Sequence, residues 1–128
     1  MNNFDNLDQL RAKNAFNACQ KNCFGGAKGG EVVKKLPPMI RENGFLGALA
    51  FALSKKEKET QGYAGTFDAI AVHLQIVDKV VSRTAETLQK ELLECSSLKL
   101  RDVTVEAMLY LDYLRRYAST GKDSTDEK

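Results

Sequence analysis

Apolar residues recur at intervals of three and four along most of the chain, which is the spacing that places side chains on one face of an α-helix. The spacing is most regular from residue 67 onward, and no segment alternates strictly between apolar and polar residues as a half-buried strand does. The pattern therefore predicts an all-α fold, namely a compact single-domain bundle of five or six helices. The residues of the regular part are Phe67, Ile70, Leu74, Val77, Val81, Leu88 and Leu92.

Glycines, prolines and charged runs divide this pattern into segments. A charged connection is expected over residues 55–61, and the hydroxyls near residues 82–84 predict a break, although a continuous helix there also fits the pattern. Residues 119–128 contain Gly121 and many charges and predict a disordered tail, so the helical domain is expected to cover residues 1–118. The helices expected are 6–24, ended by Gly25 and Gly26, then 31–43, 45–54, the stretch from residue 67, and 98–118.

A basic segment followed directly by an apolar one, over residues 34–53, is the most distinctive stretch. Its first half contains both prolines of the chain, Pro37 and Pro38, and ends in an Asn-Gly pair at Gly44, a combination that stops helices. The prolines predict either a kink or a helix that begins at Pro37. The apolar half, residues 45–53, is shorter than the ~20 residues that cross a membrane, so it predicts a buried helix after a left-handed Gly44.

Length, charge and cysteine content fit one ordinary globular domain. The chain has 128 residues, of which 43% are hydrophobic, and its net charge of +2 neither indicates nor excludes a nucleic-acid partner. Residues 1–62 carry a net charge of +4 and residues 63–128 one of −2. Three cysteines without a signal peptide predict free thiols and a cytoplasmic location.

The sequence predicts no catalytic residue, no metal site and no cofactor. His73 is the only histidine and lies beside the apolar face of its helix, which is typical of a structural histidine. Cys19 and Cys23 are four residues apart on one helix, a separation that suits neither a disulfide nor the paired ligands of zinc. The pattern leaves open any role of these two and of Cys95 beyond core packing. A thiol enzyme is an alternative only if Cys19 or Cys23 is accessible and acidic.

The last predicted helix carries two apolar stripes. The second stripe consists of Val105, Leu109 and Tyr113, which lie roughly opposite the first. It has two explanations: the helix is central and buried on both sides, or the stripe is an interface with another subunit. The first stripe, expected in the core, is formed by Leu100, Val103, Ala107, Leu111, Leu114 and Ala118.

Basic residues favour contact with nucleic acid over any catalytic function. Lys34, Lys35 and Arg41 crowd one helix, and further lysines precede and follow it. The apolar helix after it offers no side chain that could hydrogen-bond a base edge, and no exposed aromatic residue is evident for stacking a base. Contacts to phosphates that do not depend on base sequence are therefore the expected mode of binding.

Two segments of the chain resemble the small subunit of the Cmr effector complex, the RNA-guided type III-B CRISPR system. They stand in the order and at the distance typical of that family, and together they cover about a third of the chain. The first contains KLP at 35–37, IRENG at 40–44, ALAF at 48–51 and LS at 53–54; the second contains VEA at 105–107, YL at 110–111 and LRRYA at 114–118.

The resemblance implies a six-helix, non-catalytic protein whose copies stack end to end beside the filament that holds the CRISPR RNA and line the channel for target RNA. The second stripe of the last helix is then the expected subunit interface. The implied partners are other Cmr subunits, further copies of the chain, and CRISPR RNA and target RNA, with no membrane and no small-molecule substrate. A freestanding helical scaffold or protein-interaction module without an RNA role is the alternative. The expected RNA-binding residues are Lys34, Lys35, Arg41, Arg115 and Arg116.

Overall fold

A computed structural model describes residues 6–21, 31–55 and 57–127, and the side chains of all of these except 57–61 and 119–127. Over these residues the chain forms five α-helices and no strand, so the predicted all-α fold is confirmed. The helices are α1 (Leu7–Cys19), α2 (Glu31–Ser54), α3 (Glu57–Ile76), α4 (Ala85–Leu93) and α5 (Ser97–Glu127).

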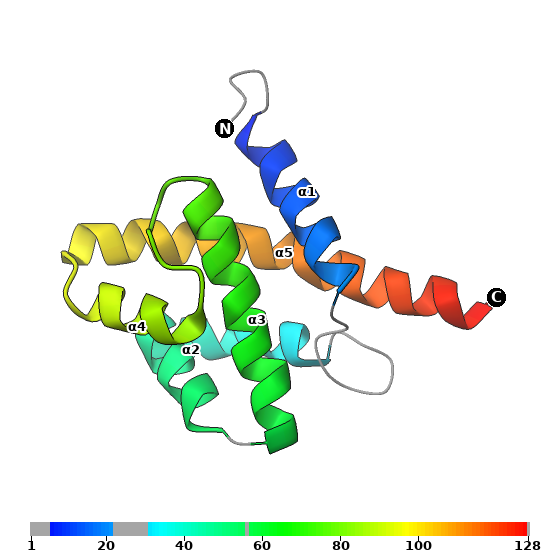
Figure 1. Ribbon diagram of the computed structural model, residues 1–128, viewed down its shortest axis with the longest axis horizontal. Helices are drawn as coiled ribbons and strands as arrows, with labels where there is room; N and C mark the ends of the chain where they lie inside the picture. The colour runs from blue at the N-terminus through cyan, green and yellow to red at the C-terminus, as the bar shows by residue number, and fades with distance from the viewer. Residues whose placement is uncertain (1–5, 22–30, 56, 128) are drawn as a thin grey trace.

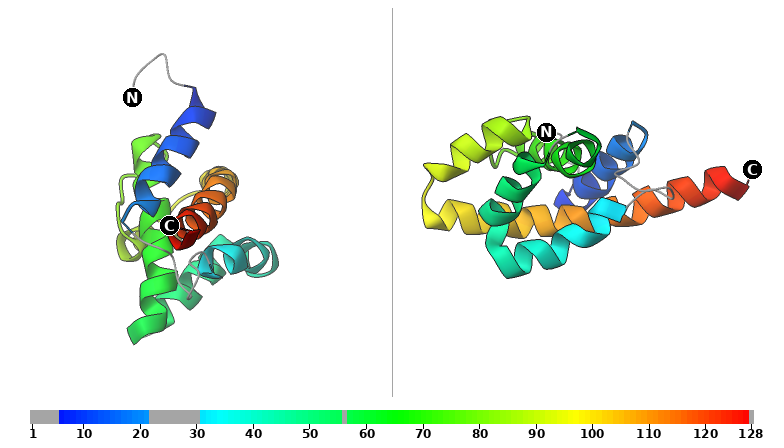
Figure 2. Two further views of the ribbon diagram at one scale, coloured as in Figure 1. Left: turned by 90° about the vertical axis from the view of Figure 1, so that its right-hand side faces the viewer. Right: turned by 90° about the horizontal axis from the view of Figure 1, so that it is seen from below.

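The longest helix, α5, runs the length of the molecule, and the other helices pack on it or on one another (Figure 1). α1, α2 and α3 all contact α5, while α4 contacts α2 and α3. α1 crosses the C-terminal half of α5, and the first half of α2 runs back along α5 in the opposite direction (Figure 2). The N-terminal helix and the C-terminal half of the last helix therefore lie side by side, although they are far apart in the sequence.

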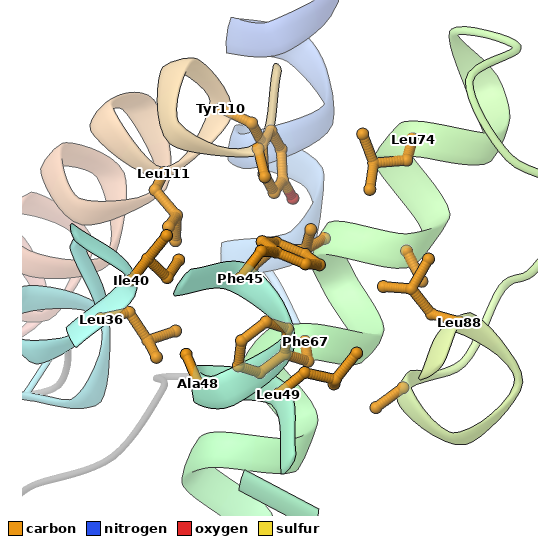
Figure 3. Packing of buried hydrophobic residues seen from close by; sticks show 14 of the residues in the cluster. Leu36, Ile40, Phe45, Ala48, Leu49, Phe67, Leu74, Leu88, Tyr110 and Leu111 are labelled. Atoms are coloured by element: carbon orange, nitrogen blue, oxygen red, sulfur yellow. The ribbon is translucent and has the colours of Figure 1, made fainter. Parts of the chain in front are cut away.

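The core lies where α2, α3 and α5 meet (Figure 3). Phe45 of α2 meets Phe67 of α3 edge-on, with ring centroids 5.4 Å apart and ring planes at 79°, an arrangement that aromatic pairs favour. Leu36 and Ile40 lie next to Leu111 of α5, and each of these five side chains is at most 3% exposed. The core stripe predicted on the last helix is confirmed at Val103, Ala107, Leu111, Leu114 and Ala118, with Leu100 partly buried.

Asn6 caps the start of α1. Its side chain accepts a hydrogen bond from the backbone N–H of Gln9 at 2.7 Å, and the Gln9 side chain accepts one from the backbone N–H of Asn6 at 3.1 Å. The pair satisfies two backbone donors that the first helical turn leaves without a partner. The helix ends at Cys19, earlier than the end predicted at residue 24. The stop signal predicted at residues 25–26 lies outside the described residues.

Gly44 divides α2 into two helical halves, as the sequence predicts. Its backbone angles, φ 81° and ψ 162°, are non-helical inside α2. The positive φ agrees with the prediction, but the ψ places Gly44 in an extended region that is open essentially to glycine alone, and not in the left-handed helical region. Pro37 and Pro38 lie inside the first half of α2, which begins at Glu31, so the predicted start at Pro37 is wrong.

The chain breaks between α3 and α4, over residues 77–84, which confirms the break predicted near residues 82–84. The Glu91 carboxylate of α4 holds this connection, because it accepts hydrogen bonds from the backbone N–H groups of Val81 and Ser82 at 3.1–3.2 Å. These bonds satisfy donors that a continuous helix would have paired internally. Val81 itself is 83% exposed, so its predicted place on the apolar stripe is wrong.

Charged segments are helical at two places where the sequence predicts otherwise. α3 begins at Glu57, within the charged connection predicted over residues 55–61. The backbone of α5 continues to Glu127, through the segment for which the sequence predicts a disordered tail. Glutamate and lysine are good helix formers, so charge by itself is a poor signal that a helix has ended. The predicted limit of the domain at residue 118 stays a prediction.

Candidate nucleic-acid and subunit interface

Three basic residues face solvent on the first half of α2. Lys34, Lys35 and Arg41 are exposed, and none of them forms an ion pair with the part of the chain that the structure describes. Lys34 and Arg41 are seven residues apart, so they lie on one side of the helix with about 10 Å between them along its axis. Leu36 and Ile40 of the same helix are buried in the core, and this holds the basic side outward.

Arg115 and Arg116 are exposed on α5 and share one acidic partner. Asp112 lies 3.0 Å from Arg115 and 3.5 Å from Arg116, whose side chains are 47% and 67% exposed. Such exposed ion pairs contribute only ~0–1 kcal/mol, so both guanidinium groups can still bind another anion. Arg115 follows Leu111 by one turn, on the side of α5 that packs against α2. Arg116 follows Tyr113 by three residues, on the side toward α1, so it lies away from the three basic residues of α2 although it shares Asp112 with Arg115.

An exposed apolar line on α5, here called the outer stripe, consists of Leu98, Val105 and Leu109. These side chains are 76%, 54% and 44% exposed, and their separations of seven and four residues place them on one side of the helix. The explanation that α5 is buried on both sides is therefore wrong for Val105 and Leu109. Tyr113, predicted to continue this line, is half-buried and donates its hydroxyl hydrogen to Asp8 of α1 at 2.8 Å.

A network of polar side chains ties α1, α3 and α5 together inside the domain. Arg11 of α1 donates two hydrogen bonds to Glu106 of α5, at 2.8 and 2.9 Å. His73 of α3 bonds to the same carboxylate through Nε2 at 2.8 Å, and to the side-chain amide of Asn14 through Nδ1 at 2.9 Å. The His73 ring also stacks on Tyr110, with centroids 4.3 Å apart. Since His73 is fully buried with both nitrogens bonded, its prediction as a structural histidine is confirmed.

Burial and neighbouring charges set the protonation of this network. Burial lowers the pKa of His73, and the hydrogen bond with Glu106 offsets this only in part. Burial by itself raises the pKa of Glu106, but the hydrogen bonds from Arg11 and His73 outweigh it and hold the pKa of Glu106 below its usual value. At neutral pH the ring is therefore neutral, donating from Nε2 and accepting at Nδ1. The side chains of the network bond to one another, and these bonds hold α1, α3 and α5 together. They belong to Arg11, Asn14, His73 and Glu106.

The pattern of the sequence does not single out Arg11, Asn14 or Glu106. One signal is present in the sequence: Glu106 stands directly before Ala107 of the core stripe, and a carboxylate at the edge of a core needs a partner inside the domain. Its partners, however, are 33 and 95 residues away in the chain. Spacing along one helix cannot identify partners on other helices.

The two described cysteines, Cys19 and Cys95, are free thiols of intermediate burial. Burial raises the pKa of Cys19 to about 11, so its thiolate is scarce at neutral pH and the alternative of a thiol enzyme at Cys19 is not supported. Cys95 donates weakly to the Leu92 carbonyl oxygen at 3.3 Å, and Cys23 lies outside the described residues. Among the described residues, no group of three or more histidine, cysteine or acidic side chains could hold a metal ion. None of the described helices has the length and apolarity needed to cross a membrane.

Comparison with known proteins identifies the family. The family model for CRISPR-associated protein (Cas_Cmr5) matches residues 7–120. This chain belongs to the Cmr5 family. It is therefore a subunit of the Cmr complex of type III-B CRISPR defence, as the resemblance of its two motifs predicts, and the alternative of a freestanding scaffold is set aside. No curated protein matches the chain.

A solved structure of the Cmr5 family has the same fold. It is the X-ray crystal structure of a CRISPR-associated Cmr5 family protein from Thermus thermophilus, with a TM-score of 0.68 and 21% sequence identity. The match covers 91% of this chain and 97% of that chain. Because few residues are identical, the likeness concerns the fold alone.

Proposed function

We propose that this Cmr5 chain is the non-catalytic small subunit that stacks with further copies of itself beside the filament holding the CRISPR RNA. In this position it helps to hold target RNA through contacts to phosphates, in the cytoplasm, as part of antiviral defence. The outer stripe is the proposed interface between copies, joined by Tyr113 at its edge. The proposed phosphate contacts are Lys34, Lys35, Arg41, Arg115 and Arg116.

The observation that best supports the RNA role is that some cationic side chains in the described part of the chain form an ion pair with a carboxylate, whereas others there are exposed without one. Lys79, for example, lies 2.9 Å from the Asp102 carboxylate, and much of its charge is offset there. Lys34, Lys35 and Arg41 are exposed without such a partner among the described residues. An unpaired cation attracts phosphate without first giving up an ion pair. The first half of α2 places three such cations within about two helical turns, and this clustering supports it as a surface for a nucleic-acid backbone.

Contacts of this kind hold a strand without reading it. Phosphate contacts fix the position of a nucleic acid but carry no information about its bases. Residues 45–53 of the second half of α2 pack into the core with Phe45, Ala48, Leu49 and Ala52 and present no side chain that could hydrogen-bond a base edge. A subunit of this kind can serve any pair of guide and target, because base pairing between the two RNA strands supplies the specificity.

The outer stripe supports stacking between copies. Leu98, Val105 and Leu109 expose apolar surface along the longest helix, and burying such surface stabilises a contact by about 25 cal/mol per Å². In a head-to-tail stack the stripe contacts a different surface of the next copy, and contacts of that type propagate along a filament. A filament of small subunits therefore needs only one type of contact, which each pair of neighbouring copies repeats.

Charge reversal in the reconstituted Cmr complex tests the RNA role. A variant with Lys35→Glu, Arg41→Glu and Arg116→Glu should bind target RNA more weakly. The slope of log affinity against log salt should fall by about one for each phosphate contact that is lost. Lys90→Glu makes one such charge reversal at an exposed position of α4 and is the control for the effect of a single reversed charge. An unchanged salt slope in the triple variant contradicts the proposal.

A further inference from the structure

Three aromatic rings from α1 and α5 form a partly exposed group, here called the aromatic cluster: Phe16, Tyr113 and Tyr117. Phe16 meets Tyr117 edge-on, with ring centroids 5.7 Å apart and ring planes at 86°. Tyr117 stacks on Tyr113, one turn earlier in α5, with centroids 6.2 Å apart and planes at 20°. Phe16 is 51% exposed, so the expectation that the chain has no exposed aromatic residue is wrong.

The ring of Phe16 has a face available to a partner. In an edge-on pair one ring directs its edge at the face of the other, so the contact with Tyr117 covers at most one face of Phe16. Leu10 and Ala15 already anchor α1, since they are only 6% and 0% exposed. Phe16 is therefore not needed as a core residue of this helix, and a planar partner that covers its free face gains the free energy of burying it.

A second exposed phenylalanine, Phe51, differs from Phe16 in how its ring is covered. Phe51 is 37% exposed and meets Tyr63 edge-on, with centroids 5.2 Å apart. The ammonium group of Lys55 lies 4.7 Å from the centroid of the Phe51 ring, a cation–π contact in which the chain itself covers a face of the ring. Phe51 is therefore a matched control for Phe16: an exposed phenylalanine in an edge-on pair whose ring already has a cation above it.

Cations flank the aromatic cluster. Arg116 is 67% exposed, directly precedes Tyr117 and follows Tyr113 by three residues. Lys13 is exposed three residues before Phe16, on the same side of α1. Aromatic rings beside cations are the combination by which proteins bind single-stranded nucleic acid: bases stack on the rings and phosphates contact the cations.

The acidic side chains near the cluster are engaged within the domain. Asp8 accepts the hydrogen bond from the Tyr113 hydroxyl at 2.8 Å and lies 3.8 Å from Arg11. Asp112 contacts the two arginines that follow it. Their charges are thus partly offset, and they oppose the approach of a polyanion less than free carboxylates would.

We propose that the aromatic cluster is a stacking site for an unpaired nucleobase of single-stranded RNA, with Arg116 and Lys13 contacting the adjacent phosphates. The inference rests on the proposed function, because it adds a base contact to the phosphate contacts of the same subunit. Stacking uses the flat face that every base has, so it depends on base sequence as little as the phosphate contacts do. A protein partner would also bury Phe16, but the flanking cations favour a polyanion.

Phe16→Trp provides a direct reporter, because the chain contains no tryptophan and this variant then has a single one. The purified chain is titrated with a short single-stranded oligoadenylate at low salt, where phosphate contacts are strongest. Stacking of adenine on the indole ring should quench the tryptophan fluorescence. Phe51→Trp, titrated in the same way, should be quenched much less.

An abasic RNA of the same length separates stacking from phosphate binding, because it keeps the phosphates and lacks the bases. The wild-type chain should bind the oligoadenylate about fivefold or more tightly than the abasic RNA, from the lower end of the stacking energies measured for single bases. Phe16→Leu, which keeps an apolar side chain but has no ring, should remove this difference. Phe51→Leu should keep it.

The outcomes separate this inference from the proposed function. Equal affinity of the wild-type chain for the two RNAs overturns base stacking and leaves the phosphate contacts standing. If the isolated chain binds neither RNA at low salt, the stacking site is also overturned, while charge reversal in the assembled complex decides the proposed function separately. If complex assembly without RNA shifts the emission of the Phe16→Trp variant to the blue and abolishes quenching, a protein partner covers the cluster, which likewise overturns the stacking site.

Discussion

His73 and Glu106, which are 33 residues apart in the chain, share a hydrogen bond of 2.8 Å inside the domain. The bond joins α3 to α5, and Arg11 extends the connection to α1 through the same carboxylate. This polar contact therefore helps to set the position of α1, the helix that carries Phe16 of the aromatic cluster. Removing one member leaves the others buried without their partner, and such groups are costly.

Glu106→Ala should lower the free energy of unfolding by about 3 kcal/mol, because Arg11 and His73 lose their shared acceptor. Urea unfolding at neutral pH measures the change. Asp112→Ala is the control: it removes an exposed carboxylate from the same helix and should cost less than about 1 kcal/mol. An equal decrease in the free energy of unfolding of the two variants would show that the buried network stabilises the domain no more than an exposed carboxylate does.

The stability of the domain should decrease below neutral pH because of His73. Its pKa in the folded chain lies below the ordinary value of 6.5, so below that pH the unfolded chain takes up a proton that the folded chain does not. The contribution of the neutral ring is therefore complete above pH 6.5 and is lost as the pH falls toward the folded-state pKa. The carboxylate of Glu106 adds a further loss below pH 4.5, since its pKa is held low in the folded state.

Urea unfolding between about pH 7 and pH 5.5 measures the His73 contribution without that of Glu106, whose pKa is held low. His73 is the only histidine of the chain, so His73→Gln should show a much smaller decrease over this window. A decrease of the same size in His73→Gln and in the wild type would exclude His73 as its cause.

Gly44→Ala should destabilise the domain by about 1–3 kcal/mol because of the backbone alone. An added Cβ meets no atom within 4 Å, but the φ of +81° is one that alanine rarely adopts. Gly47→Ala is the matched control three residues later, within a regular turn of α2. There an added Cβ lies 3.1 Å from the Cβ of Asn43, and the helix preference of alanine, worth about 1 kcal/mol, offsets this close contact. The prediction fails if thermal unfolding of Gly44→Ala matches the wild type.

Cys19 should react slowly with iodoacetamide in the folded chain at neutral pH. Burial raises its pKa to about 11, and its sulfur lies 3.8 Å from the Leu114 carbonyl oxygen at the contact between α1 and α5. Mass spectrometry of the labelled peptides, with and without urea, gives the ratio of the two rates. Labelling of Cys19 that is as fast in the folded chain as in urea contradicts its burial and its raised pKa.

Val105→Asp combined with Leu109→Asp should reduce the number of small subunits in the reconstituted complex without unfolding the chain. Both side chains are exposed, at 54% and 44%, and surface substitutions usually change stability by only ~0.5 kcal/mol. Native mass spectrometry counts the copies, and circular dichroism checks the fold. Leu93→Asp, at a 64% exposed position of α4 away from the outer stripe, is the control. An unchanged copy number in the double variant argues against the outer stripe as the interface.

The sequence by itself determined the local structure wherever one residue type has a unique backbone or packing requirement. Gly44 separates the two halves of α2 because its conformation is open essentially to glycine. The apolar spacing from Val103 to Ala118 identifies the buried side of α5 because burial follows the helical repeat. Helix ends, such as the end of α1 at Cys19, were predicted less well, since they depend on caps and contacts as well as on composition.

Only the tertiary structure decided which helix faces meet and how far each contact extends. Periodicity places a side chain relative to the axis of its own helix, but it contains no information about the neighbouring helix that covers it. For this reason the sequence left Val105 and Leu109 ambiguous between core and interface. It also could not bring Glu106 to His73 and Arg11, or place an exposed Phe16 against Tyr117. Those relationships arise from packing between segments far apart in the chain.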